Sequence, residues 1–302
     1  MTVLSKKLLS HMLSFKSKRL IKASIANPLC ERLVISLIRK YPDIKSLERI
    51  IPLCIDYPTG SLRICERNSH NFELDLSDYQ DWLIYYNRKD DSSDFVTNYA
   101  SPGFFCFDIG ANVGQTTLLL ASAVGPKGKV YSFEPINKTY KKLVTNIFAN
   151  KQYGNISTFQ VAVGSTDSYA VAKNDSKTSS GSATCAPQQP GSVVDDSVVV
   201  PMLTLDTFVA ENSVPRVDLV KIDVEGYEPS VLEGARKTIE RFRPKIVLEI
   251  SYELLIRAGY TVKDITSYFD SYNYRLVSVQ DEKTFRALDY TGHGDFVACP
   301  LP

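Results

Sequence analysis

The residues best suited to chemistry are carboxylates that lie where apolar runs of the sequence end. Asp108 ends the run at 104–109, and Glu134 ends the run at 129–134. Asp223 and Glu225 follow the run at 217–222, and Glu249 lies near the end of 245–251. Carboxylates at such places can accept protons from ligand hydroxyl or amino groups and can act as general bases. The sequence therefore predicts a ligand site built from the ends of several elements.

The segment DIGANVG connects the first of these carboxylates to a helix. Gly110 and Gly114 permit a sharp turn and a close approach of backbone to a ligand, and the helix N-terminus that follows offers unpaired N–H groups. A dinucleotide fingerprint needs a further glycine, where this chain has Gln115. The spacing instead matches the loop of S-adenosylmethionine-dependent methyltransferases, with Asn112 as the middle residue. An NAD-dependent oxidoreductase stays as the disfavoured alternative.

The cofactor-binding candidates have separate roles. Asp108 is expected to contact the amino group of the methionine moiety, and Gly110, Asn112 and Gly114 to shape the loop. Glu134, twenty residues after Gly114, can accept both ribose hydroxyls. Two further residues, Ala162 in the third predicted strand and Asp223, complete the set.

The catalytic candidates are Asp223, Glu225, Glu249 and His293. A hydroxyl acceptor is a poor nucleophile, so a base should take its proton. Asp223 and Glu225 could share a site and raise one pKa, while Glu225 could instead be a charge that stabilises a helix N-terminus. His293 lies between glycines before the last predicted strand, where it is either a loop residue or a base. Lys221 could neutralise the carboxylates or point outward.

The same carboxylates raise the question of a metal. Asp223, Glu225 and Glu249 could bind Mg²⁺ through oxygen, but no spacing requires it, and we predict no metal. Asp206 in the segment TLDTF is expected to cap a helix rather than to catalyse.

Apolar runs and helical patterns alternate from residue 104 onward, which predicts a parallel sheet with helices on both faces. The expected strands are 104–109, 129–134, 156–163, 217–223, 245–251, 274–279 and 295–300. The expected helices are 114–125, 137–151, 228–242 and 261–272. A polar insert at about 165–197 is expected to be disordered or to form a lid.

The first part of the chain differs in charge from the rest. Residues 1–40 hold nine basic residues and one acidic residue, a net charge of +8 in a chain whose total is +1. Helical patterns at about 3–26 and 28–41 indicate a helix docked on its own domain, one on a membrane surface, or a transit peptide. No apolar stretch is long enough for a membrane span, and six scattered cysteines favour a reducing compartment.

Several segments resemble the FkbM-type methyltransferases. DIGANVGQTT, YSFEP, TLDTF, VDLVKIDVEGYEPSVLEGA and PKIVLEIS occur in the order seen in that family, and the resemblance covers about 72–280. It implies a Rossmann-like seven-stranded α/β sheet and methyl transfer from S-adenosylmethionine, usually to a hydroxyl of a sugar, glycolipid or secondary metabolite. We expect a basic accessory region at 1–71 and a methyltransferase domain at 72–302.

The predicted function is O-methylation of a hydroxyl on a sugar, glycoside or related metabolite. An N-methyltransferase, with Tyr227 and Tyr252 beside carboxylates, and a non-catalytic cofactor-binding scaffold remain alternatives. The expected partners are a small-molecule or saccharide acceptor and no nucleic acid. A weak contact of the basic N-terminus with a membrane surface is left open. The expected location is cytoplasmic.

Overall fold

The computed structural model describes residues 22, 24–41, 49–87, 92–174, 183–187, 197–280, 285 and 290–302. The chain forms two compact units. One unit contains Met1–Arg67 and Phe72–Lys89, and the other contains Asn68–Asn71 and Asp90–Pro302. Every described helix is too short or too polar to span a lipid bilayer. The predicted helix at 3–26 lies almost entirely outside the described residues.

The smaller unit is built around an ion pair that joins a helix to a strand. Its elements are α3 (Pro28–Lys40), η1 (Cys54–Asp56), β1 (Leu62–Arg67), most of β2 (His70–Asp75) and α5 (Tyr79–Tyr86). Glu31 of α3 is fully buried and accepts two hydrogen bonds from Arg63 of β1, at 2.7 and 2.8 Å. The hydroxyl of Tyr85 in α5 donates to the same carboxylate at 3.2 Å. These bonds fix α3 against the rest of its unit.

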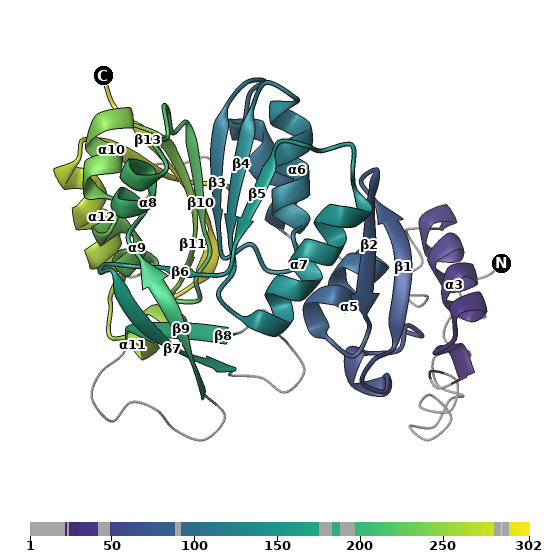
Figure 1. The fold of residues 1–302 in the computed structure, drawn as a ribbon. Helices are drawn as coiled ribbons and strands as arrows, with labels where there is room; N and C mark the ends of the chain where they lie inside the picture. The colour runs from purple at the N-terminus through teal and green to yellow at the C-terminus, as the bar shows by residue number, and fades with distance from the viewer. Residues whose placement is uncertain are drawn as a thin grey trace. The chain divides into compact units, whose positions relative to one another are not determined.

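The larger unit contains, in its described part, a seven-stranded sheet of order β12-β13-β11-β10-β3-β4-β5 (Figure 1). Its strands are β3 (Phe105–Ile109), β4 (Lys129–Phe133), β5 (Ile156–Phe159), β10 (Leu219–Ile222), β11 (Lys245–Ser251), β12 (Tyr274–Ser278) and β13 (His293–Pro300). This order and the flanking helices confirm the predicted Rossmann-like methyltransferase fold.

The expectation of an entirely parallel sheet is wrong for β13. This strand runs antiparallel to both of its neighbours, β11 and β12. A strand that pairs with the one before it in the chain can run antiparallel after a short return, whereas parallel pairing needs a crossover of a dozen or more residues. The 14 residues between β12 and β13 would allow either direction, and many doubly wound folds carry an antiparallel strand in an otherwise parallel sheet.

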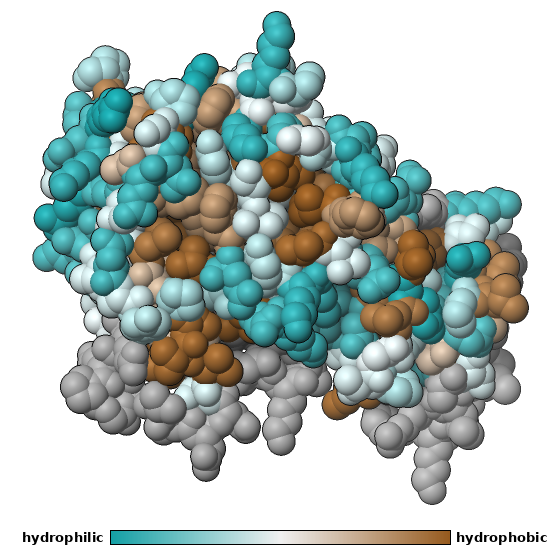
Figure 2. Space-filling view, in the orientation of Figure 1, coloured by the Kyte–Doolittle hydropathy of each residue, from teal (hydrophilic) through white to brown (hydrophobic). Residues whose placement is uncertain are grey.

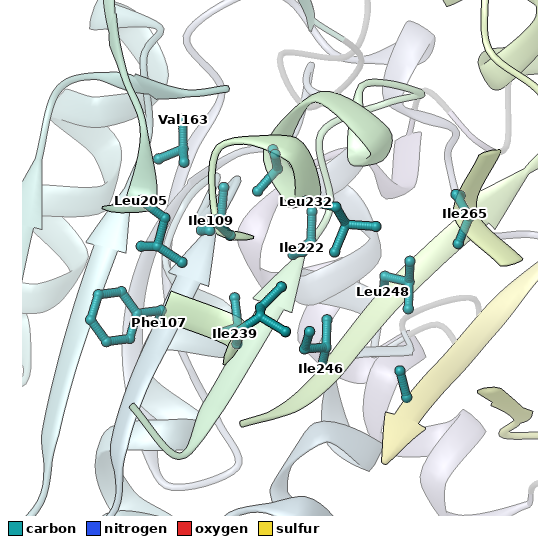
Figure 3. Close-up of a cluster of buried hydrophobic side chains, with 14 of the residues drawn as sticks. Phe107, Ile109, Val163, Leu205, Ile222, Leu232, Ile239, Ile246, Leu248 and Ile265 are labelled. Atoms are coloured by element: carbon teal, nitrogen blue, oxygen red, sulfur yellow. The ribbon is translucent and has the colours of Figure 1, made fainter. Parts of the chain in front are cut away.

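Helices cover both faces of this sheet (Figure 1). One face packs against α8 (Leu205–Glu211), α9 (Glu228–Glu233), α10 (Arg236–Phe242), α11 (Tyr252–Ala258) and α12 (Val262–Ser271), and Figure 3 shows part of this core. The other face packs against α6 (Gln115–Val124) and η2 (Ser92–Tyr99). Because side chains alternate along a strand, neighbouring residues join different cores: Phe107 joins the first, and Cys106 the second.

Helix α7 (Asn137–Ala149) buries a different face from the one that its apolar residues predict. Leu143 is fully buried, but Phe148 is 69% exposed and Val144 is 41% exposed. Asn146 is buried instead, because its amide donates to the backbone oxygen of Val113 in the turn after β3 at 2.8 Å. A satisfied polar side chain therefore occupies the buried face of α7.

The expectation that the insert is disordered is wrong for its described residues. These form β7 (Ser168–Asn174), β8 (Ala183–Pro187) and β9 (Ser197–Leu203), which join β6 (Ala162–Val163) in a four-stranded sheet of order β6-β9-β7-β8. Ala170, Ala172, Val200 and Met202 are buried together there. Residues 175–182 and 188–196 lie outside the described residues, so a lid formed by them stays a prediction.

The helix predicted at 228–242 is divided into α9 and α10. Gly234 lies at the break, where an added Cβ would come 1.9 Å from the backbone oxygen of Gly164. The carboxylate of Asp206 accepts hydrogen bonds from the backbone N–H groups of Lys237 and Thr238 in the first turn of α10. Asp206 is therefore a helix cap, as the sequence predicts, but for α10 rather than for its own helix, where Thr204 is the N-cap.

Candidate functional site

Charged side chains replace apolar ones where the central strands reach their carboxyl ends. Asp108, Lys221, Glu249 and Asp295 each lie two residues from an apolar residue that packs in the core with α6, so they point to the same face of the sheet. Asp108 and Lys221 are register partners, as are Glu249 and Asp295. The sheet thus brings together carboxylates that are far apart in the sequence.

Asp108 is fully buried at the end of β3. One carboxylate oxygen, Oδ2, accepts a hydrogen bond from Oγ1 of Thr117 at 2.6 Å. The other, Oδ1, lies 3.5 Å from Nζ of Lys221 and has no hydrogen-bond partner among the described residues. A buried oxygen without a donor is costly, and a ligand amino group would supply the missing bond.

Lys221 connects the loop to two carboxylates. Its Nζ donates to the backbone oxygen of Gly110 at 3.2 Å and to Oδ2 of Asp223 at 3.1 Å. Burial alone would lower the pKa of Lys221, but the charges of Asp223 and Asp108 outweigh it and raise the pKa. Lys221 therefore stays protonated and holds the strand ends together, and its side chain does not point outward.

The turn after β3 has the geometry of a cradle for a ligand. Gly110 has a φ of +81°, and a Cβ there would lie 1.8 Å from the backbone oxygen of Asp223. Gly114 has a φ of +94°, and its Cβ would lie 2.7 Å from Leu143. Asn112 also has positive φ, and its buried Oδ1 has no hydrogen-bond partner among the described residues. Both glycines are therefore required, and Asn112 keeps an acceptor for a ligand.

Glu134 follows β4 and is 6% exposed. Its two oxygens accept hydrogen bonds from the backbone N–H groups of Asn112, at 3.1 Å, and Ile136, at 2.9 Å. Burial raises the pKa of Glu134 to about 7, although these two bonds act in the opposite direction. The carboxylate is tied to the same loop that Asp108 begins, and each oxygen retains a lone pair for a ligand hydroxyl.

Glu228 is a buried carboxyl that sequence reasoning missed. Its Oε1 accepts from the backbone N–H groups of Val224, at 3.2 Å, and Gly226, at 3.1 Å. Glu225, with a φ of 54°, lies in this turn. Burial raises the pKa of Glu228 to about 7. In the sequence it looks like an ordinary acidic residue in a first helical turn, but it shapes the turn that presents Asp223.

Glu249 and His293 form a pair at the ends of β11 and β13. Nε2 of His293 lies 3.2 Å from Oε1 of Glu249. The side chain of His293 is 64% exposed, and that of Glu249 is 22% exposed. Burial and the nearby carboxylates of Asp223 and Glu225 raise the pKa of Glu249. His293 is the first residue of β13, paired with Ser251, rather than a turn residue before the strand. An imidazole oriented by a carboxylate can act as a general base.

The remaining candidates from the sequence are an alanine, a metal site and a tyrosine. Ala162 is 5% exposed and pairs with Met202 of β9, so it lies in the second sheet, three residues after β5 ends. Among the described residues, no three histidine, cysteine or acidic side chains are arranged to hold a metal ion. Tyr227 contacts Tyr260, with ring centroids 6.2 Å apart.

Known proteins resemble the part of the chain that carries most of the carboxylates of this site, but the family match ends before His293. The family model of the FkbM methyltransferase domain matches residues 108–276. A hexuronic acid methyltransferase, AglP of Haloferax volcanii, is 24% identical over 160 residues, which cover 53% of this chain and 59% of that protein. The chain thus spans less than two thirds of that curated relative.

Three solved structures have similar folds at low identity. A methyltransferase FkbM from Methylobacillus flagellatus is 17% identical, with a TM-score of 0.44 and coverage of 73% of this chain and 55% of that one. An O-methyltransferase from Thermotoga maritima is 12% identical, with a TM-score of 0.40 and coverage of 85% and 82%. An rRNA methylase from Streptococcus thermophilus is 12% identical, with a TM-score of 0.41 and coverage of 70% and 95%.

The cofactor of this chain is S-adenosylmethionine, as the loop spacing predicts. The described residues fit it in one respect. The loop leaves buried acceptor atoms of Asp108 and Asn112 without hydrogen-bond partners among the described residues. A bound polar ligand would supply the missing donors.

Proposed function

Because the chain belongs to the FkbM methyltransferase family, we propose that it transfers a methyl group from S-adenosylmethionine to a hydroxyl oxygen, with a saccharide hydroxyl as the favoured acceptor. The observation that carries this proposal is the pair formed by Glu249 and His293, 3.2 Å apart. A hydroxyl must lose a proton as it reacts, and this pair offers a base on the same face of the sheet as the cofactor loop.

Three side chains would hold the cofactor, and two glycines shape the turn that carries them. Asp108 would accept from the amino group of the cofactor, Asn112 from another donor, and Glu134 from the ribose hydroxyls. Gly110 and Gly114 allow the turn to pack closely against its neighbours. When bound, the cofactor supplies a methyl group on a positively charged sulfur, which an oxygen nucleophile can take. Positioning two reactants in this way contributes about 7–11 kcal/mol in favourable cases.

Proton removal is assigned to His293. With Nε2 directed at Glu249, the imidazole keeps Nδ1 to accept the hydroxyl proton. Glu249, whose pKa is raised by burial and by the nearby carboxylates, orients the imidazole through this contact. Asp223 is the second candidate, but one of its carboxylate oxygens already accepts a hydrogen bond from Lys221.

The charge of this end of the sheet favours a neutral acceptor. The carboxylates of Asp223, Glu225 and Asp295 lie close enough to Glu249 to raise its pKa. The cation beside them, Lys221, is held by Asp108 and Asp223. The relative from Haloferax is named for a hexuronic acid, whereas a carboxylate-bearing acceptor would be repelled here. Neutral sugar hydroxyls, which donate to carboxylates, suit the site better.

An amine acceptor is the second candidate, because an ammonium group would also be attracted to these carboxylates. Methylation on nitrogen would not need His293 as a base once the amine is neutral. The two functions therefore differ both in product and in dependence on His293.

The test is a screen of neutral saccharides, uronic acids and amino sugars with S-adenosylmethionine, with the product identified by mass spectrometry and NMR. We expect one methyl group on oxygen of a neutral sugar. In His293→Gln, we expect kcat to fall by about 10²–10⁴ with unchanged cofactor affinity. An N-methylated product, or a wild-type kcat in His293→Gln, would contradict the proposal.

A further inference from the structure

A continuous apolar row lies on the exposed side of α3. Leu29 is 75% exposed, Leu33 65%, Leu37 43% and Tyr41 44%. Residues four apart in a helix lie above one another on one side. Figure 2 shows hydrophobic side chains at the surface over this helix. Scattered exposed leucines are ordinary, but a contiguous apolar row indicates a binding surface.

The side chains beside this row are polar or basic. Arg32, Ser36 and Lys40 are exposed on α3 and are also spaced four residues apart. Arg32 and Ser36 line a groove that both Arg67 and Glu66 of β1 also line. The exposed side of α3 is therefore amphipathic, with an apolar row next to a basic one.

The acidic residue of this helix is removed from the surface. Glu31 is the one acidic residue in the sequence from 1 to 42. It is fully buried, and Arg63 of β1 neutralises it through two hydrogen bonds. The fold thus leaves the exposed side of α3 without a carboxylate, although its sequence contains one.

The sequence before α3 adds positive charge. Residues 1–27 contain Lys6, Lys7, Lys16, Lys18, Arg19 and Lys22 and no acidic residue. Positive charge next to an apolar helical face is complementary to a lipid surface with anionic headgroups, where each basic residue contributes about 1 kcal/mol. A second copy of this chain would bring two positive surfaces together, which opposes dimerisation through this face.

We propose that α3 is a membrane-surface helix that binds anionic lipid, with Leu29, Leu33, Leu37 and Tyr41 entering the interface and Arg32 and Lys40 at the headgroups. Such a helix lies in the plane of the interface and does not span the bilayer. This proposal is independent of the proposed methyl transfer, because it uses no residue of the candidate functional site.

The test is flotation of the full chain with vesicles of phosphatidylcholine alone and of phosphatidylcholine mixed with phosphatidylglycerol. We expect binding to the anionic vesicles, little binding to the neutral ones, and release by salt. The double variant Leu33→Glu, Leu37→Glu should lower the bound fraction about tenfold or more, which corresponds to about 1.4 kcal/mol. Phe148→Glu, at a residue that is 69% exposed in the other unit, is the matched control and should bind like wild type.

Circular dichroism and light scattering on the same variants keep the result interpretable. The double variant should keep the wild-type melting temperature and S-adenosylmethionine affinity, because both leucines are exposed. Equal binding to neutral vesicles, no binding to anionic ones, or undiminished binding by the double variant would overturn the proposal. A wild-type dimer that the double variant dissociates would assign the face to a second copy of the chain instead.

Discussion

Glu134 is a buried carboxyl that must be ionised if it is to fill its proposed role as an acceptor for both ribose hydroxyls. In the cofactor-free chain, burial raises its pKa to about 7. Below this pH the carboxyl is protonated, and one oxygen becomes a donor. Hydrogen bonds from a ligand to the carboxylate favour the ionised form, so binding below pH 7 must release a proton.

We therefore expect the affinity for S-adenosylmethionine to increase as the pH rises through about 7. Glu134→Gln should remove most of this dependence and lower the affinity at pH 8 by about 10- to 100-fold, since a hydrogen bond to a charged group contributes roughly 1.5–3 kcal/mol. Calorimetric titration between pH 6 and pH 8, which spans the pKa of Glu134 of about 7, measures both effects.

The matched control is Glu240→Gln, at an exposed position of α10. Its affinity and pH dependence should equal those of wild type. A wild-type affinity that does not change with pH, together with an unchanged affinity in Glu134→Gln, would remove Glu134 from the cofactor site.

At the scale of elements, the turn between β10 and α9 depends on Glu228. This side chain is 2% exposed and accepts hydrogen bonds from two backbone N–H groups of the turn. Its pKa in the folded chain is about 7, compared with an ordinary value of 4.5. Between these two pH values the folded chain holds a proton that the unfolded chain has lost. The free energy of unfolding therefore falls as the pH rises through this window.

Glu228→Gln removes this loss, because its amide oxygen can accept the same two bonds and carries no charge. We expect the variant to be more stable than wild type above pH 7 by roughly 1–3 kcal/mol, since each pKa unit corresponds to about 1.4 kcal/mol, and to differ little at low pH. Urea unfolding across the pH range measures this. An equal or lower stability of Glu228→Gln at pH 8, beside an unaltered Glu240→Gln, would refute the assigned pKa.

At the scale of the whole molecule, the parts that could be predicted are those that local sequence determines. Asp108 and Glu134 lie at the ends of apolar runs, and the positive-φ glycines come shortly after Asp108. The strand ends and the turn can therefore be predicted from the sequence alone. The family resemblance then implies the seven-stranded Rossmann-like fold. The sequence does not predict strands β7, β8 and β9, because their short apolar runs lie in a segment rich in serine, glycine, proline and glutamine.

The parts that could not be predicted depend on register between distant strands. Lys221 has two possible directions in the sequence, and only its pairing with Asp108 across β3 and β10 shows that it points toward the loop. The contact of Glu249 with His293 likewise requires the antiparallel β13. On α7, Asn146 is buried because of a hydrogen bond to Val113, a contact that hydrophobic periodicity does not reveal.

The central claim is that the turn after β3 holds S-adenosylmethionine. The most direct measurement is calorimetric titration of the full chain with S-adenosylmethionine and, separately, with NAD, for wild type and for Gly110→Ala. The account predicts micromolar binding of S-adenosylmethionine by wild type and no binding of NAD. It also predicts loss of binding in Gly110→Ala, where the new Cβ would lie 1.8 Å from the oxygen of Asp223. No detectable binding of S-adenosylmethionine by wild type, or equal binding of NAD, would contradict this claim.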